Sequence, residues 1–234
     1  MRVTSHMLDI TCHAGQFAPP AAPTGPAGGG AAGGPSGSRR YSRPMVNLTR
    51  IYTRTGDQGT TALGDMSRTH KTDLRIGAYA DVNEANAVIG VALALGELPE
   101  EVRAVLVRVQ NDLFDVGADL ATPVVPDPEH PPLRVEQGYI DKLEADCDRF
   151  LADLEKLRSF ILPGGTPAAA LLHQACTVVR RAERSTWAAL AEHEESMNQL
   201  TATYLNRLSD LLFILARTAN QEVGDVLWVP GENR

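Results

Sequence analysis

Apolar residues recur at intervals of three and four along most of the chain, which is the spacing of an α-helix. This pattern predicts five helices over the ranges Asp73–Leu95, Pro99–Leu120, Val135–Leu157, Pro167–His193 and Asn198–Glu222. Strand-like alternation is nearly absent, and only the short segment Asp225–Trp228 is expected to be extended. Several amphipathic helices in sequence predict an all-α fold, an antiparallel five-helix bundle.

Three of the predicted helices show which side chains carry the pattern. The second helix has a single stripe of Val102, Leu106, Val109, Leu113 and Val116. The fifth is expected to turn inward Leu205, Leu208, Leu212, Leu215 and Ala219. The first has apolar positions at Ile76, Ala80, Ala87 and Val91. Each stripe is the core-facing side that a helical bundle requires.

Composition is that of one ordinary domain preceded by a tail. The chain has 234 residues, 43% of them hydrophobic, and contains no apolar run long enough to span a membrane. Its net charge of −7 argues against general nucleic-acid binding. The odd count of three cysteines, without a C-x-x-C pair, favours reduced thiols in a cytoplasm over a disulfide framework or a zinc site.

Residues 1–44 differ from the rest, with eight of the twenty glycines and six of the fifteen prolines. Such a segment buries too little apolar surface to fold, so we expect a disordered tail before a domain at 45–234. A tail with arginines and few acids also fits an organellar transit peptide, although its glycine and proline content opposes the amphipathic helix required. A third interpretation is that translation starts at Met45 and that the start codon has been assigned too far upstream.

The most informative segment runs from Phe160 to Arg184. Thr166 and Pro167 follow a Pro-Gly-Gly break and suit the N-cap and first turn of a helix. Further along, the spacing places His173, Thr177, Arg180 and Arg184 on one helical face. Such a cationic stripe either binds a polyanion or is a solvated face in which Glu183 pairs with its neighbours.

A second segment, TRTGDQGTT at residues 53–61, combines two glycines with four threonine hydroxyls. Glycines let backbone amides approach an anion closely, and hydroxyls add donors to phosphate oxygens. Lys71 follows as a mobile positive charge. The chain lacks both the P-loop and the dinucleotide-binding fingerprint, so this loop is either a phosphate-binding nest or an ordinary turn.

Taken in order, these segments resemble the ATP:cob(I)alamin adenosyltransferases of the propanediol-utilisation (PduO) type. The resemblance extends over roughly residues 48–231. It also rests on NDLFDVGADLAT at 111–122, FILPGGT at 160–166, RRAER at 180–184 and NRLSD at 206–210. Several motifs in the same order are specific, whereas each alone is weak. The resemblance implies a ferritin-like five-helix bundle that assembles as a homotrimer with active sites between subunits.

The resemblance also implies a chemistry. Family members transfer the 5′-deoxyadenosyl group of ATP, bound with Mg²⁺, to the cobalt of cob(I)alamin and release triphosphate. Co(I) is the nucleophile, so the protein supplies alignment and charge neutralisation and no side-chain base. No dedicated protein metal site is expected, because the Mg²⁺ is bound with the nucleotide.

Site residues follow from the matched motifs. The implied ATP-binding residues are Thr53, Arg54, Thr55, Gly56, Asp57, Gly59, Thr61, Lys71, Arg180, Arg181, Glu183, Arg184 and Asn206. Arg180, Arg184 and Phe160 are the implied catalytic residues, and Phe160 matches the aromatic residue that helps to displace the lower axial ligand of the corrinoid. Phe213 matches a second aromatic wall on the cobalamin side; by their residue type alone, both phenylalanines would be assigned to the core.

The chain departs from the family at one pair of positions on the cobalamin side. Asn83 and Cys176 stand where the family has an aspartate and an arginine that form an ion pair between subunits. Both partners are missing together, which leaves no unpaired buried charge. The departure puts the affinity for the corrinoid in question more than the ATP site.

Two other functions stay open at this stage: a carrier of adenosylcobalamin without activity, and a helical bundle that only senses ATP. The first has no need of a triphosphate site, and the second has no need of Phe160 and Phe213. An adenosylcobalamin-dependent mutase and a cobalamin reductase are possible partners. We expect a bacterial cytoplasmic protein, in preference to one of the mitochondrial matrix, without membrane or nucleic-acid partners.

Overall fold

The computed structural model describes residues 52–128 and 130–231, and the predicted tail at 1–44 lies outside them. The described residues contain five α-helices: α2 (Leu74–Leu95), α3 (Glu100–Ala121), α4 (Gln137–Leu151), α5 (Pro167–His193) and α6 (Leu200–Ala219). A short 3-10 helix, η2 (Glu194–Ser196), joins α5 to α6. The five-helix, all-α prediction is therefore confirmed.

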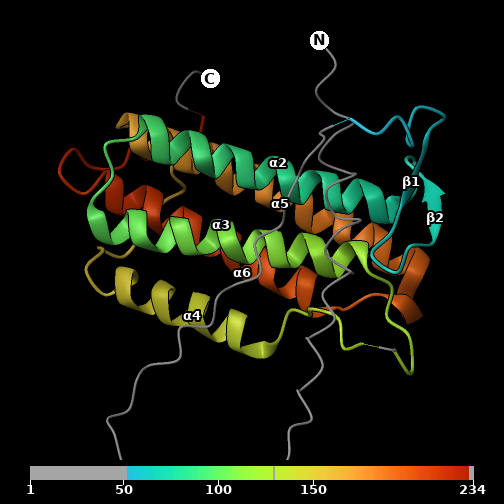
Figure 1. The fold of residues 1–234 in the computed structure, drawn as a ribbon. Coiled ribbons are helices and arrows are strands. Elements are labelled where there is room, and N and C mark those ends of the chain that lie inside the picture. Colours follow the sequence, from blue (N-terminus) through green and yellow to red (C-terminus); the bar gives the residue numbers. More distant parts are fainter. Residues whose placement is uncertain (1–51, 129, 232–234) are drawn as a thin grey trace, which may run out of the picture.

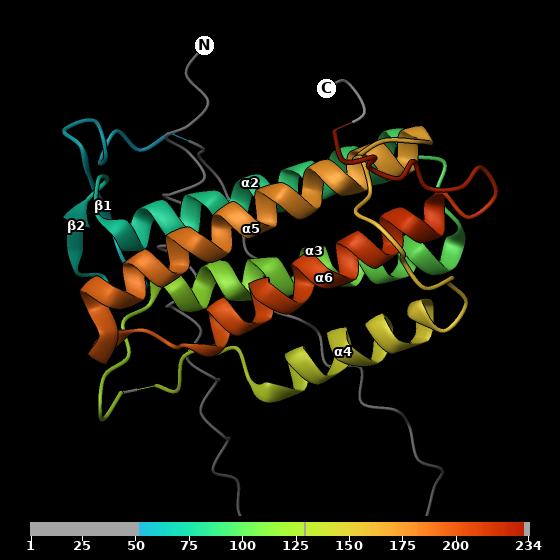
Figure 2. The same ribbon diagram turned by 180° about the vertical axis from the view of Figure 1, so that it is seen from behind.

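The helices form two layers with one additional helix. In Figures 1 and 2, α2 lies beside α5, α3 lies beside α6, and α4 covers the far side of the α3–α6 layer. Consecutive helices run antiparallel. However, α4 runs parallel to α6, because Glu144 contacts Arg207 near the middle of both helices and Asp153 contacts Gln221 just beyond the C-terminus of both.

The predicted core stripes are confirmed for α3 and α6 but not for α2. All five predicted positions of α3 are buried, and so are Leu205, Leu208, Leu212 and Leu215 of α6, while Ala219 is partly buried. On α2 only Ile76 is buried, whereas Ala80, Ala87 and Val91 are exposed. Since α2 is apolar on most of its circumference, the pattern could not identify the face that packs inward.

Most helix ends lie within three residues of those predicted, but the end of α4 does not. Helix α4 ends at Leu151, six residues before the predicted end at Leu157. Carbonyls beyond that point accept bonds from the end of α6 and the residues after it instead of continuing the helix: Arg217 donates to the Glu155 carbonyl (2.8 Å) and Gln221 to the Asp153 carbonyl (3.2 Å). These tertiary bonds replace the helical ones, which helical periodicity along the sequence does not reveal.

A small hairpin was missed by the sequence pattern. Strands β1 (Thr60–Ala62) and β2 (Arg68–His70) pair antiparallel directly before α2. The predicted extended segment near the C-terminus does form, as one isolated bridge between Ile161 and Leu227. Each strand has only three residues, too few for a visible alternation of polar and apolar positions.

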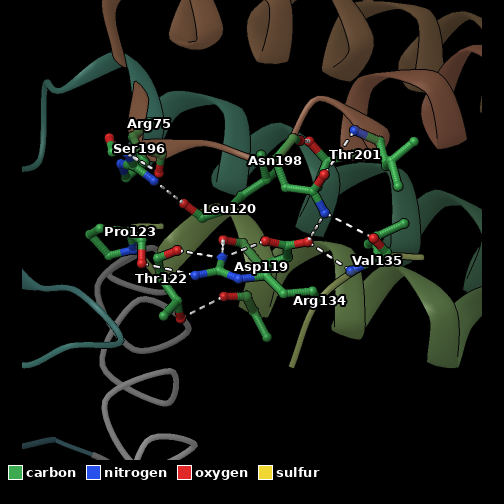
Figure 3. A network of polar contacts seen from close by, with 12 residues as sticks. Arg75, Asp119, Leu120, Thr122, Pro123, Arg134, Val135, Ser196, Asn198 and Thr201 are labelled. Carbon is green, nitrogen blue, oxygen red and sulfur yellow. Dashed lines mark hydrogen bonds and ion pairs between the residues drawn. The ribbon is translucent and has the colours of Figure 1, made fainter. Parts of the chain in front are cut away.

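Buried polar contacts fix one end of the bundle (Figure 3). The side chain of Asp119, at the C-terminal end of α3, accepts from Arg134 (2.6 Å), the amide of Val135 (2.7 Å) and Asn198 (2.7 Å). Arg75, which is 2% exposed, donates to the Leu120 carbonyl at 3.0 Å. These bonds hold Arg134 and Val135, which precede α4, and Asn198, which precedes α6, at the end of the bundle where α2 begins.

Candidate functional site

The arginine-bearing face of α5 begins where the sequence places it. Thr166 caps the helix by accepting from the amide of Ala169 (3.1 Å), and Pro167 occupies the first turn. Thr177, Arg180 and Arg184 are exposed on this helix, as the helical spacing predicts. His173 shares this face by its spacing but is 6% exposed, because it packs edge-on against Phe213 with ring centroids 5.9 Å apart.

Arg180 and Arg184 differ from the arginine between them. Within residues 52–128 and 130–231, neither Arg180 nor Arg184 has an ion pair or a side-chain hydrogen bond. Arg181, by contrast, lies 3.8 Å from Asp81 and closer still to Glu84, both on α2. Arg181 thus links α5 to α2, while the other two present uncompensated charge to solvent.

Glu183 lies on the same helix and connects it to α6. Its Oε1 accepts from Asn206 Nδ2 (3.1 Å) and from Trp187 Nε1 (3.3 Å). The structure therefore brings two of the predicted ATP-binding residues, Glu183 and Asn206, into direct contact. Glu183 does pair with its neighbours, as the interpretation of this face as a solvated one expects. However, neither Arg180 nor Arg184 is among those partners.

The glycine loop is folded as a tight turn that leads into β1. Its amides at Asp57 and Gly59 donate to the carbonyls of Arg54 (3.4 Å) and Gly56 (3.2 Å). Gly59 has φ +80° and Arg54 has φ +64°, a backbone region that a non-glycine residue adopts rarely. Since the turn uses these two amides internally, they are not free to bind an anion as a nest would.

The other predicted residues of this loop lie close together. The hydroxyls of Thr53 and Thr55 are 2.9 Å apart and exposed. Gly56 is buried, and a side chain there would meet Lys71 Nζ at 2.8 Å. The Thr61 hydroxyl is buried and has no hydrogen-bond partner in the described part of the chain. The ammonium of Lys71 thus lies against the loop at Gly56.

Sequence reasoning missed Arg68, which holds the loop in shape. Its guanidinium donates to the Thr55 carbonyl (2.9 Å) and to the Thr60 hydroxyl (2.7 Å). Arg68 lies in β2, across the hairpin from the loop, and this hairpin was not predicted. A recognised hairpin would have been the only signal that this arginine supports the loop.

The N-terminus of α2 joins the hairpin to the end of α5. Asp73 caps α2 by accepting from the Arg75 amide (2.9 Å) and also contacts His193 Nε2 (2.8 Å). Partial burial opposes the change, but hydrogen bonds from Thr69, the Arg75 amide and His193 lower the pKa of Asp73. The glycine loop is therefore anchored at the end of the bundle where α5 ends.

On the predicted cobalamin side, Phe160 is 76% exposed and its ring lies 5.9 Å from that of Trp228. The loop that follows Phe160 is pinned to the end of α6, because Asn220 accepts from the Thr166 amide (2.9 Å) and donates to the Gly164 carbonyl (3.0 Å). A Cβ at Gly165 would lie 2.2 Å from Asn220, so this close approach requires glycine. The PGGT motif thus fixes the path of the backbone between Phe160 and the start of α5.

The two positions that depart from the family pattern lie in different surroundings. Cys176 is 2% exposed and its thiol donates to the Ser209 carbonyl of α6 (3.2 Å). Burial raises the pKa of this thiol. Asn83 is half-buried on α2, and the structure shows no bond between it and Cys176 in the described residues. Cys176 therefore fills the core of the subunit.

The glycine loop and Phe160 lie at opposite ends of the bundle: Figure 2 shows β1 and β2 at one end and the segment that leads into α5 at the other. The hairpin precedes α2, whereas Phe160 pairs through its backbone with the segment that follows α6. The 22 residues of α2 that separate these ends correspond to about 33 Å at the rise of an α-helix. One subunit alone therefore does not bring the glycine loop, on the predicted ATP side, together with Phe160, on the predicted cobalamin side.

Known proteins resemble this chain over its whole described bundle. The family model for cobalamin adenosyltransferase matches residues 51–219. A corrinoid adenosyltransferase of Mycobacterium tuberculosis is 64% identical over 189 residues, covering 81% of this chain and 97% of that protein. One from Bacillus subtilis is 41% identical over 182 residues, covering 76% and 91%.

Solved structures agree with these sequence relatives. A phenylalanine-to-alanine variant of a PduO-type ATP:corrinoid adenosyltransferase from Lactobacillus reuteri, complexed with cobalamin and ATP, matches with a TM-score of 0.70 and 36% identity. The match covers 76% of this chain and 99% of that one. This chain belongs to the cobalamin adenosyltransferase family, and its fold is that of the PduO type.

Proposed function

We propose that this protein transfers the 5′-deoxyadenosyl group of ATP to cob(I)alamin, producing adenosylcobalamin and triphosphate. The observation that carries the proposal is the pair of exposed arginines, Arg180 and Arg184, which have no partner among the described residues. Relatives that are 64% and 41% identical are corrinoid adenosyltransferases. The chemistry of the transfer accounts for a site without a side-chain nucleophile.

In the proposed reaction the electron pair of Co(I) attacks the ribose C5′ and forms the Co–C bond. The C5′–O5′ bond breaks, and its electron pair leaves on the triphosphate. Arg180 and Arg184 neutralise this leaving group, because charge-assisted hydrogen bonds from guanidinium to phosphate oxygens are strong and geometrically defined. The exposed hydroxyls of the glycine loop and the ammonium of Lys71 hold the rest of the nucleotide.

Glu183 and Asn206 orient the nucleotide from the neighbouring surface of α5 and α6. Their mutual hydrogen bond of 3.1 Å fixes the amide of Asn206, so its remaining hydrogen-bonding capacity faces outward. Arg181 is held by two acids of α2, and we therefore assign it to positioning α5. On the cobalamin side we assign Phe160 and Phe213 to the corrin surface.

The proposed Mg²⁺ is bound through the phosphates of ATP. In the part of the chain that the structure describes, no three His, Cys, Asp or Glu side chains gather as metal ligands would. A phosphate-bound Mg²⁺ needs only one or two protein oxygens, and it usually retains several waters. Asp57, exposed in the glycine loop, is the acid that we assign to this contact.

We propose a site shared between subunits of a homotrimer, and the separation of the glycine loop and Phe160 supports it. It is supported by apolar side chains exposed on the helices, including Val91 (42%) and Leu95 (69%) on α2 and Phe114 (60%) on α3. Val91 and Leu95 lie one turn apart on α2, and exposed apolar patches of this kind mark contact surfaces between proteins. Light scattering on the purified chain should give three times the mass of the 25.2 kDa subunit.

The transfer is tested by mixing protein, ATP, Mg²⁺ and chemically reduced cobalamin and following the Co(I) absorption band. The expected result is loss of the band with stoichiometric adenosylcobalamin and triphosphate, and no change when ATP is omitted. Binding of adenosylcobalamin without turnover would support a carrier instead. Binding of ATP alone would support an ATP-sensing bundle.

Other aspects of the biological setting stay predictions. None of the described helices is both long and apolar enough to cross a membrane. A cytoplasmic location, a recipient mutase and a cobalamin reductase are consistent with the proposed reaction. The roles of Asn83 and Cys176 toward cobalamin are also predictions; Cys176 could act only through the packing of α5 on α6, because its side chain is buried.

A further inference from the structure

The backbone around Phe160 is held by the segment that follows α6. The amide of Trp228 donates to the Phe160 carbonyl (2.7 Å), and the amide of Leu162 donates to the Val226 carbonyl (2.8 Å). The Ser159 hydroxyl donates to the Trp228 carbonyl at 2.8 Å. These bonds flank Phe160 on both sides, so the C-terminal segment fixes where this residue stands.

The side chains of Phe160 and Trp228 form an exposed aromatic pair. Their ring centroids are 5.9 Å apart, and the rings are inclined by 57°. The exposed fractions are 76% for Phe160 and 44% for Trp228. Tilted aromatic pairs at this distance attract each other beyond simple burial, so each ring restricts the rotamers of the other.

The packing of the bundle gives no reason for this aromatic pair to be exposed to solvent. Leu162, Val226 and Val229 beside it are also exposed, at 47%, 55% and 54%. An exposed apolar surface that includes two adjacent rings suits a large, flat, partly apolar ligand better than it suits water. The macrocycle of a corrinoid has this shape.

We propose that Trp228 is a positioning residue for the corrinoid: it holds the ring of Phe160 in the orientation that meets the lower face of the macrocycle. This inference rests on the proposed function. Trp228 acts through the ring contact, and its backbone bonds keep the two segments side by side. A freely rotating Phe160 would spend less time where it excludes the lower axial ligand of Co(II).

The test compares the full chain with Trp228→Ala, Trp228→Phe and the control Val223→Ala. Val223 is an exposed residue (65%) of the same segment, outside the bridge. With ATP bound, the fraction of four-coordinate cob(II)alamin is measured by electron paramagnetic resonance and visible absorption. Turnover then gives separate KM values for cob(I)alamin and ATP, and thermal unfolding reports the fold.

In Trp228→Ala we expect the ratio of four-coordinate to five-coordinate cob(II)alamin to fall about three- to tenfold. This is the range that the loss of one aromatic contact produces. The KM for cob(I)alamin should rise by a similar factor while the KM for ATP stays within about twofold. Trp228→Phe should restore most of the four-coordinate fraction, and Val223→Ala should match the wild type.

A Trp228→Ala protein with the wild-type four-coordinate fraction and wild-type KM for cob(I)alamin would overturn the inference. If that variant unfolds, Trp228→Leu keeps the apolar contact without the ring, and wild-type values in that protein would overturn the inference equally. A wild-type chain that forms no adenosylcobalamin would instead refute the proposed function itself. Equal losses in both KM values would indicate a general structural role and would also contradict the inference.

Discussion

Two groups of arginines in this molecule are built in opposite ways. Arg75 and Arg134 lie at one end of the bundle, where every bond shown in Figure 3 ends on a carbonyl, a hydroxyl or the carboxylate of Asp119. Arg180 and Arg184 stand on α5 without any such partner in the described residues. A guanidinium that is satisfied within the subunit supports the fold, whereas an unsatisfied one remains available to a ligand.

The difference matters because both groups look alike in the sequence. All four are arginines of one chain, and charge alone does not say which of them has a partner. Burial of an arginine is tolerated only when its donors are satisfied, and Arg75 achieves this through two carbonyls and a hydroxyl. Removing members of the two groups should therefore change different observables.

The largest effect is expected at the unpartnered arginines. Arg180→Ala and Arg184→Ala should each lower turnover about 10- to 100-fold, because each removes a charge-assisted hydrogen bond of about 1.5–3 kcal/mol to the leaving triphosphate. Melting temperatures should stay near that of the wild type. Arg149→Ala is the matched control, since Arg149 is half-exposed on α4, far from the proposed site in sequence. Near-wild-type turnover in both variants would remove this assignment.

The second effect, on stability, is expected at Arg134. Its partner Asp119 has a fully buried side chain, so Arg134→Ala leaves a buried carboxylate without its cation. Loss of one partner of a buried ion pair costs about 3–5 kcal/mol of unfolding free energy. Urea unfolding should show this loss, while turnover per folded molecule stays unchanged. A loss below about 1 kcal/mol would mean that the network does not support the fold.

Arg181 sharpens the comparison because it lies between the two unpartnered arginines yet pairs with α2. Its side chain is 47% exposed, so Arg181→Ala should change stability by less than about 1 kcal/mol. Turnover should fall less than in either neighbouring variant. If Arg181→Ala were as inactive as Arg180→Ala, then Arg181 would leave its acids when ATP binds, and the distinction drawn here would fail.

The smallest effect concerns His173, the member of the predicted stripe that is buried. Burial lowers the pKa of His173, although Asp225 acts in the opposite direction. The folded state therefore binds a proton less readily than the unfolded chain, and stability falls as pH drops from about 6.5 toward the lowered pKa. His173→Leu should lose less melting temperature between pH 7.5 and pH 5.5 than the wild type. An equal loss would exclude His173 as a source of acid sensitivity.

Local signals predicted the bundle well. The α3 and α6 stripes and the Thr166–Pro167 start of α5 depend on residues close together in sequence, and the structure confirms them. The predicted core-facing positions of α2 were mostly wrong, because apolar residues occupy most of the circumference of this helix. The end of α4 depends on Arg217 and Gln221, more than sixty residues further along the chain, which no local pattern contains.

The candidate site was predicted in parts. Helical spacing identified Arg180 and Arg184 as neighbours, but it also included His173, since one face of a helix can be partly covered by another helix. The role of Arg68 depends on a hairpin of three-residue strands, and that of Trp228 on one isolated bridge. Such pairings are set by tertiary contacts, so a reading of single segments does not find them.

The central claim is that Arg180 and Arg184 bind a polyanion, and direct binding of inorganic triphosphate tests it. Calorimetric titration of the wild-type chain with triphosphate and Mg²⁺ should show saturable binding that weakens as salt increases. Binding should fall at least about tenfold in each single alanine variant and should be undetectable in the double variant, while Arg149→Ala binds like the wild type. Equal affinity in the wild type and the double variant would contradict the account.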